Sequence, residues 1–255
     1  MCLIGFKWQN HPGHPLVLVG NRDEFFDRPT QALHRWPSGM FAGKDLKAGG
    51  TWMGFHPNGR FAYLTNYRDL RRPVQGALTR GDLVRDFVEG NLKPEAYLKR
   101  IAQRQERYEG FNLLVGTPEE LYYLSNYGDA ISRLAPGTYG LSNGLLNNDW
   151  SKVRRIQEDL EALPEQPYLE DLLQLAGGQN VDPDHLLPDT GASLHQERQL
   201  SAQFIRLDDY YGTVSTTAVL WREDGQVELL ERAYLGQQTR IQEAHVRFQI
   251  KKSRA

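Results

Sequence analysis

Apolar runs of strand length, each ending at turn residues, occupy the first third of the chain. Four strands are predicted there in two hairpin-like pairs, residues 2–8 with 16–20 and residues 49–55 with 61–65. The first pair is joined by Asn-His-Pro-Gly-His at residues 10–14, and the second by Pro-Asn-Gly at residues 57–59. The alternation predicts that the fold begins with two β-hairpins.

The middle of the chain carries helical periodicity. Three helices are predicted at Leu83–Glu89, Pro94–Gln103 and Ser151–Leu163. We expect residues 79–82 to cap the first helix, and Pro94 suits the first turn of the second. In the third, apolar residues recur at the spacing of one buried face. Short extended pieces are predicted between the helices, at residues 112–115, 121–125, 131–134 and 139–142.

Residues 176–197 contain two adjacent glycines, acids beside prolines and no periodicity. This composition predicts a long loop with short helical turns, and we consider it the best candidate for a lid. Three strands then close the chain, at residues 213–222, 227–234 and 244–250. Strands from both chain ends, with helices from the middle, predict an α+β fold in which helices cover two stacked sheets.

Composition excludes several classes of function. The 30 Lys and Arg residues nearly balance the 32 Asp and Glu residues, so no electrostatic footprint for nucleic acid is present. No apolar run approaches the roughly 18 residues of a membrane span, and we expect no secretory signal. A single cysteine forms no intramolecular disulfide, which favours a reducing, cytoplasmic location.

Histidine and glycine patterns indicate no metal or cofactor. The seven histidines lack the spacing of metal ligands, and no second cysteine is present to complete a structural zinc site. The pair Gly49-Gly50 lacks the lysine that follows in a phosphate-binding loop, so nucleotide binding is not expected. We therefore expect the protein to work without a cofactor.

Cys2 is the most informative residue, because it directly follows Met1 and is the only cysteine. Removal of Met1 would place a free α-amine and a thiol on the same residue. An α-amine titrates near pH ~8 and a thiol near ~8.5, so each can exchange a proton with the other. N-terminal nucleophiles of this kind carry out acyl transfer and amide cleavage. The alternative is that Cys2 is a small apolar residue of the first strand.

The polar run Asn21, Arg22, Asp23 and Glu24 comes directly after the second predicted strand. Such a run is often a solvated turn, but here it ends a strongly apolar strand that is expected to be buried. If Arg22 lies near Cys2, its charge favours the thiolate, and Asp23 can orient the α-ammonium group.

Six motifs occur in an order that is together specific, although none is decisive alone. They are Cys2, Asn21–Glu24, Ala42–Leu46, Gly49–Gly54, Thr65–Arg68 and Gly140–Gly144. In these motifs the chain resembles the NRDE family, which is named for its tetrapeptide and includes the Transport and Golgi organization 2 proteins. The resemblance covers essentially the whole chain, and we expect residues 1–255 to form one domain of this type.

The resemblance implies a branch of the N-terminal nucleophile hydrolases, which have a four-layer αββα sandwich. Cysteine members of that superfamily cleave non-peptide amide bonds, as penicillin V acylases and bile-salt hydrolases do. By this resemblance Cys2 is the nucleophile, and Arg22 and Asp23 are the charged pair beside it, at a spacing that differs slightly. Asn66 and Asn143 resemble two asparagines that can stabilise an oxyanion, a contribution of roughly 3–4 kcal/mol when preorganised. The alternative is that both asparagines are turn residues.

The same motifs supply the predicted substrate-binding residues, which are Asn21, Glu24, Trp52 and Tyr67. The resemblance also implies an arginine where this chain has Val214. Its absence removes a positive charge that could hold a thiolate or a substrate carboxylate. Three other arginines could replace it only if the fold brings them near, namely Arg154, Arg155 and Arg222.

Two functions are compatible with these features. The first is an N-terminal cysteine hydrolase acting on a non-peptide amide or thioester of a small acyl compound. The second is a non-catalytic protein that binds or traffics haem or an acyl lipid on the same scaffold. A hydrolase requires a free and reactive Cys2, whereas a carrier does not.

Overall fold

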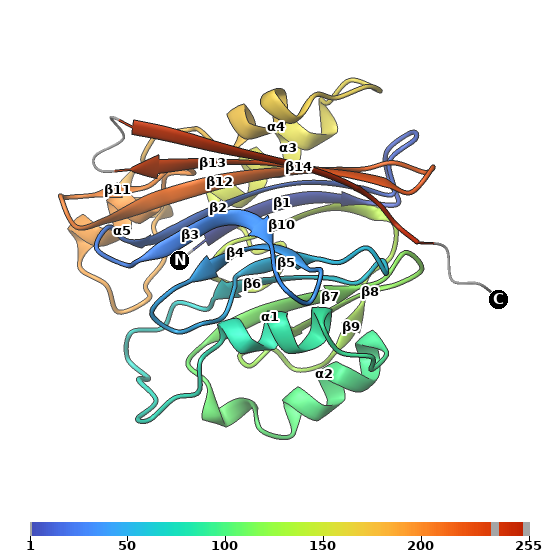
Figure 1. The fold of residues 1–255 in the computed structure, drawn as a ribbon. Helices are drawn as coiled ribbons and strands as arrows, with labels where there is room; N and C mark the ends of the chain where they lie inside the picture. Colours follow the sequence, from blue (N-terminus) through green and yellow to red (C-terminus); the bar gives the residue numbers. More distant parts are fainter. Residues whose placement is uncertain (1, 236–239, 252–255) are drawn as a thin grey trace.

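The computed structural model describes residues 2–235 and 240–251. Over these ranges the chain forms two seven-stranded antiparallel sheets stacked face to face, with helices on both outer faces (Figure 1). The predicted four-layer αββα sandwich is confirmed. In the same ranges no helix has the length and apolarity needed to cross a bilayer.

The first sheet joins the two ends of the chain. Its order is β10 (Gly137–Leu141), β1 (Cys2–Trp8), β2 (Leu16–Phe25), β12 (Tyr211–Trp221), β13 (Gln226–Leu235) and β14 (Arg240–Gln249), with β11 (Arg206–Leu207) paired to β12. The predicted hairpin of β1 and β2 lies at the centre of this sheet. Because β12 pairs with β2 and β10 pairs with β1, Cys2 at the start of β1 is surrounded by strands distant in sequence.

The second sheet is a meander in which each strand pairs with the next. It consists of β3 (Thr30–Arg35), β4 (Phe41–Asp45), β5 (Met53–Phe55), β6 (Phe61–Asn66), β7 (Phe111–Gly116), β8 (Leu121–Ser125) and β9 (Ser132–Arg133). All neighbours in this sheet are antiparallel, so no crossover connection is needed. The connection from β6 to β7 is long and contains α1 and α2.

Alternation along the central strands builds two separate cores. In β2, Leu16 and Leu18 point into the layer between the sheets, whereas Val17 and Val19 point toward the helices. Phe61 and other apolar residues of the second sheet pack into the same inner layer. Each large apolar side chain buried in this way contributes about 1.5–3 kcal/mol.

The helices cover the outer faces in two pairs. Helices α3 (Ser151–Glu161) and α4 (Leu169–Leu175) pack on the first sheet, and α1 (Gly81–Val88) and α2 (Pro94–Ala102) pack on the second (Figure 1). The apolar face predicted for the third helix is buried. Short helical segments are η1 (Gln105–Arg107), η2 (Asp184–Leu186) and α5 (Leu194–Leu200).

Four details differ from the sequence prediction. Residues 21–24 continue β2 instead of following it, because their backbone pairs with β12 and, at residues 21 and 22, also with β1. Strands β3 and β4 and helix α4 were not predicted, since each is short and weakly periodic. Only residues 53–55 of the predicted strand 49–55 are extended in a ladder. Gly49 has a φ of +78°, and the backbones of Gly50 and Thr51 bond to Asp45 and Gly81 instead. Helix α1 begins at Gly81 without the predicted side-chain cap.

The predicted loop at residues 176–197 contains η2 and the start of α5, in keeping with short helical turns. It is tied to the rest of the fold at several points. Asp182, Thr190 and Glu197 are buried, and Ser193 and Gln196 form a capping box at the start of α5.

Candidate functional site

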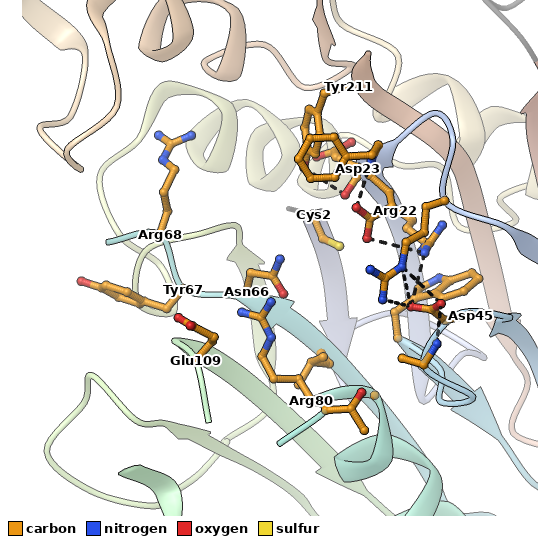
Figure 2. Close-up of a pocket in the computed structure, with 18 of the residues that line it drawn as sticks. Cys2, Arg22, Asp23, Asp45, Asn66, Tyr67, Arg68, Arg80, Glu109 and Tyr211 are labelled. Atoms are coloured by element: carbon orange, nitrogen blue, oxygen red, sulfur yellow. Dashed lines mark hydrogen bonds and ion pairs between the residues drawn. The ribbon is translucent and has the colours of Figure 1, made fainter. Parts of the chain in front are cut away.

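A cavity of about 700 Å³ opens where β1 begins and β2 ends (Figure 2). Its lining comes from both sheets, from the segment before α1 and from α5. Nine charged residues contribute to it, which are Arg22, Asp23, Glu24, Arg28, Asp45, Arg68, Asp69, Arg80 and Glu109. Of the nine predicted site residues, seven line this cavity, namely Cys2, Arg22, Asp23, Glu24, Trp52, Asn66 and Tyr67.

Cys2 is the first residue of β1 and lies opposite Arg22 on β2. Its backbone carbonyl accepts a hydrogen bond of 2.9 Å from the Ser142 hydroxyl, which holds the start of the strand in place. Burial raises the pKa of the Cys2 thiol. A hydrogen bond from the Asp23 backbone N–H and the charge of Arg22 lower this pKa, but they do not offset the effect of burial. The thiol is therefore protonated near neutrality and needs a base to become a nucleophile.

The Arg22 guanidinium carbon lies over the indole of Trp52, 4.4 Å from the ring centroid. One guanidinium nitrogen donates a hydrogen bond of 2.9 Å to the Thr30 hydroxyl, and another lies 3.7 Å from the Glu24 carboxylate. Trp52 thus acts as the platform for Arg22, and Glu24 is its charge partner at the end of β2.

Asp45 and Arg28 form an ion pair at the cavity wall that was not identified as part of the site from the sequence. The Arg28 guanidinium donates to both carboxylate oxygens, with the shortest contact at 2.7 Å. Burial opposes the charged form of Asp45, but this bidentate pair and the N–H groups of Lys47 and Ala48 lower its pKa. The sequence signal available was the motif that contains Asp45.

Asp23 is almost fully buried beneath the cavity. Its Oδ1 accepts a hydrogen bond of 2.7 Å from the Thr213 hydroxyl, and its backbone carbonyl accepts one of 3.0 Å from the Tyr211 hydroxyl. Burial raises the pKa of the Asp23 carboxyl. Both partners come from β12, so this arrangement depends on the pairing of β2 with the C-terminal strands.

The two predicted oxyanion donors occupy different positions. Asn66 ends β6 and lines the cavity, and Figure 2 shows its amide on the side that faces Cys2. Asn143 is fully buried, is absent from the cavity lining and donates its amide N–H to the Asn66 carbonyl at 2.8 Å. Tyr67, the next residue after Asn66, stacks on Tyr127 with ring centroids 4.0 Å apart.

Asn21 also lies outside the cavity lining, although it belongs to the tetrapeptide. Its amide donates to the carbonyls of Ala176 and Gln203 at 2.9 and 2.8 Å, and its oxygen accepts from Thr216. These contacts tie β2 to the segments after α4 and α5. Asn21 faces the helical layer because side chains alternate along the strand.

Val214 is the extra residue of a β-bulge in β12, since Thr213 pairs with Asp23 and Ser215 pairs with Arg22. Neither Val214 nor the three arginines considered as replacements line the cavity. Those arginines pair with carboxylates elsewhere, namely Arg154 with Asp149, Arg155 with Asp182 and Arg222 with Glu228. The arginines that line the cavity are Arg22, Arg28, Arg68 and Arg80.

A buried ion pair adjoins the cavity, and a buried lysine lies near it. The Arg68 guanidinium contacts the Glu197 carboxylate at 2.7 Å, and both side chains are buried. Lys152, in the first turn of α3, is 2% exposed and donates to the Leu200 carbonyl at 2.8 Å. Burial lowers the pKa of Lys152 to about 8, against the charge of Asp23, which raises it. The sequence had marked this helix only by its apolar face.

A metal ion would need several histidine, cysteine or acidic side chains close together. In residues 2–235 and 240–251, no three of them gather in such an arrangement. The carboxylates that line the cavity are instead engaged by arginines, hydroxyls and backbone N–H groups, as described above for Asp23 and Asp45.

Comparison with known proteins identifies close relatives over most of the chain. The model of the family described as Transport and Golgi organisation 2 matches residues 1–236. The Transport and Golgi organization protein 2 homolog of Bos taurus is 34% identical over 263 residues, covering 92% of this chain and 94% of that protein. The homolog of Homo sapiens is 33% identical, covering 92% and 94%, and the Drosophila melanogaster protein is 30% identical, covering 64% and 65%.

Two solved structures are similar at low sequence identity. One is a Caenorhabditis elegans N-acylethanolamine-hydrolyzing acid amidase ortholog, with 9% identity and a TM-score of 0.47, covering 86% of this chain and 92% of that one. The other is the C2A mutant of the conjugated bile acid hydrolase from Clostridium perfringens, with 8% identity and a TM-score of 0.45, covering 95% and 92%.

Proposed function

This chain belongs to the Transport and Golgi organisation 2 family, and we propose that it is an N-terminal cysteine hydrolase. Its substrate is a non-peptide amide or a thioester of a small acyl compound. One observation carries the proposal: the only thiol of the chain lies in the lining of a cavity of about 700 Å³, together with Asp23 and Asn66.

The reaction begins after removal of Met1. The α-amine of Cys2 accepts the thiol proton. This base is needed because burial raises the pKa of the thiol and keeps it protonated. The Cys2 sulfur then bonds to the substrate carbonyl carbon, and the Asn66 amide donates an N–H to the developing oxyanion. Collapse of this intermediate breaks the carbonyl bond to nitrogen or sulfur. The leaving group takes the proton from the α-ammonium, and Cys2 is left as a thioester.

Hydrolysis completes the cycle. The α-amine removes a proton from water, the hydroxide adds to the thioester carbonyl, and the Cys2 sulfur leaves with that proton. The products are the free amine or thiol and a carboxylic acid. In this proposal Asp23, whose backbone N–H donates to the Cys2 sulfur, orients the α-ammonium group. Arg22, opposite Cys2 on β2 and held on Trp52, favours the thiolate.

The raised pKa of Cys2 favours a second candidate function. A buried, protonated thiol is inert without the α-amine, and the cavity could then hold haem or an acyl lipid without chemical change. In this form the protein is a carrier, and Cys2 is an apolar part of the wall. Both candidates use the same cavity but differ in their need for a processed N-terminus.

Intact-mass spectrometry with acyl probes separates the two candidates. The protein with Met1 removed is incubated with p-nitrophenyl butyrate and with a butyryl thioester, and p-nitrophenolate release and acylation of Cys2 are followed. Matched samples are Cys2→Ala, Cys2→Ser and a form that carries one extra alanine before Cys2. For the hydrolase we expect an acyl adduct on Cys2 and turnover that both disappear in Cys2→Ala and in the extended form. Turnover equal to that of Cys2→Ala, with no adduct, would overturn the hydrolase and leave the carrier.

A further inference from the structure

We propose that Arg80 binds a carboxylate group of the ligand, so that the cavity accepts a compound with one negative charge and an apolar chain. This inference rests on the proposed use of the cavity for an acyl compound, but it concerns binding and needs no turnover. It is carried by the charge balance of the cavity wall and by the position of Arg80 within it.

Four arginines line the cavity, and three are neutralised by carboxylates of the chain. Arg28 makes a bidentate pair with Asp45, and Arg68 contacts Glu197 at 2.7 Å. Arg22 lies between Glu24 and Asp45, at 3.7 and 4.0 Å. These three side chains have partners before any ligand enters.

Arg80 differs from the other three. It precedes α1, and one guanidinium nitrogen donates to the Gly110 carbonyl at 2.8 Å. Among residues 2–235 and 240–251, no carboxylate lies within 4.0 Å of this guanidinium. Arg80 is half-buried, and this partial burial lowers the pKa of its guanidinium. A half-buried cation in a cavity wall, with no carboxylate at ion-pair distance, favours an anion from outside the chain.

The position of Arg80 suits a ligand that also reaches Cys2. Figure 2 shows its side chain rising from the segment before α1 toward the Asn66 amide, across the open space from Cys2. Cys2 and Arg80 line the same cavity of about 700 Å³. One ligand can therefore place a carbonyl at Cys2 and an anionic group at Arg80.

Glu109 limits how much negative charge the site tolerates. It lines the same cavity, and its carboxylate accepts an N–H from Val74 at 2.8 Å. Its charge acts on Arg80 without direct contact. A phosphate dianion would meet this repulsion with only one uncompensated guanidinium to offset it. A carboxylate carries a single charge and matches the planar fork of arginine.

The rest of the ligand is apolar, as the rim of the cavity indicates. Phe25, Leu70 and Tyr210 line the cavity and are 50%, 59% and 44% exposed. Phe25 and Tyr210 stack with ring centroids 6.2 Å apart. Large apolar side chains that gather in this way at a polar cavity mark a surface that binds apolar groups.

Calorimetric titration with four ten-carbon probes tests the proposal. The probes are decanoate, decanol, decyl phosphate and decyltrimethylammonium, which share one chain and differ in the charge of the head group. We expect decanoate to bind about 10- to 100-fold more tightly than decanol, in line with a charge-assisted hydrogen bond. Arg80→Gln should reduce decanoate affinity to that of decanol and leave decanol unchanged, and Arg80→Lys should keep part of the preference.

The control variant is Arg72→Gln, because Arg72 is exposed and does not line this cavity. It should retain the preference for decanoate. Equal binding of decanoate and decanol, a preference that survives Arg80→Gln in folded protein, or tighter binding of decyl phosphate would each overturn the proposal. All titrations are repeated in Cys2→Ala, where the hydrolase is inactive. If Cys2→Ala binds decanoate more tightly than decanol but Cys2 of the wild type is not acylated, the hydrolase proposal is rejected. The proposal for Arg80 then stands.

Discussion

The Asn143 side-chain amide donates a hydrogen bond of 2.8 Å to the backbone carbonyl of Asn66, 77 residues earlier in the chain. The Asn143 carbonyl in turn accepts the backbone N–H of Arg68. Asn143 therefore holds the end of β6 from beneath, while the Asn66 amide is presented to the cavity. The sequence predicted one role for these two residues, but the fold places Asn66 in the cavity lining and Asn143 behind it as a support.

Because Asn66 lines the cavity and Asn143 supports it from behind, replacing Asn66 should affect the reaction rate and replacing Asn143 should affect stability. Asn66→Ala should lower the acylation rate of Cys2 by about 100- to 1000-fold, the usual cost of removing an oxyanion donor, with little change in stability. Asn143→Ala should destabilise the protein by about 1–3 kcal/mol, because it leaves buried backbone groups unpaired. Acylation kinetics and urea unfolding measure the two effects. Equal rate losses with unchanged stability would contradict the assignment.

The buried pair of Arg68 and Glu197 predicts a large loss of stability when only one partner is removed. Glu197→Gln should cost about 3–5 kcal/mol, because the Arg68 charge stays buried without its counter-ion. It should also release the segment before α5, since Thr190 donates to the same carboxylate. Urea unfolding and hydrogen exchange of residues 188–193 test both points.

The matched control for this pair is Glu95→Gln. Glu95 forms an exposed ion pair with Lys99 on α2, and removing such a pair changes stability by about 0–1 kcal/mol. If Glu197→Gln is as mild as this control, the pair does not anchor the segment.

The close packing of Gly43 against Trp52 predicts that a larger residue at position 43 would disturb Arg22. A Cβ at this position would lie 2.3 Å from the Trp52 ring, so the indole must move. Because Arg22 stacks on that ring, Gly43→Ala should displace Arg22 and destabilise the protein by about 1–3 kcal/mol. Gly128→Ala is the control, since its nearest atoms lie at ordinary contact distance. Alkylation of Cys2 by iodoacetamide and thermal unfolding should change in the first variant only.

Lys152 predicts a dependence of stability on alkaline pH. Burial lowers its pKa to about 8 in the folded protein, while an unfolded lysine titrates near ~10.4. Between these values the unfolded state binds more protons, so stability rises with pH across this window and falls as pH drops toward 8. Lys152→Met removes this contribution. The wild type should gain about 2 kcal/mol relative to the variant between about pH 8 and about pH 10 in urea unfolding. Parallel pH profiles would show that Lys152 is not responsible.

Sequence patterns were sufficient for the elements whose signals are local. The hairpin of β1 and β2 follows from two apolar runs around a turn, and α3 follows from apolar residues on one face. Strands β3 and β4 and helix α4 were missed because they are short and depend on packing against neighbours. The end of β2 was misplaced because polar residues inside a strand look like a turn until their pairing partners are known.

By itself the sequence determined the layered architecture, the family resemblance and the choice of Cys2 as the candidate nucleophile, because these depend on periodicity, motif order and chemical type. Only the tertiary structure decided which motif residues meet. It placed Asn66 in the cavity and Asn143 behind it, turned Asn21 toward the helices, and brought Arg80 toward Asn66. Strand alternation and long-range pairing decide these directions, and neither can be read from a single segment.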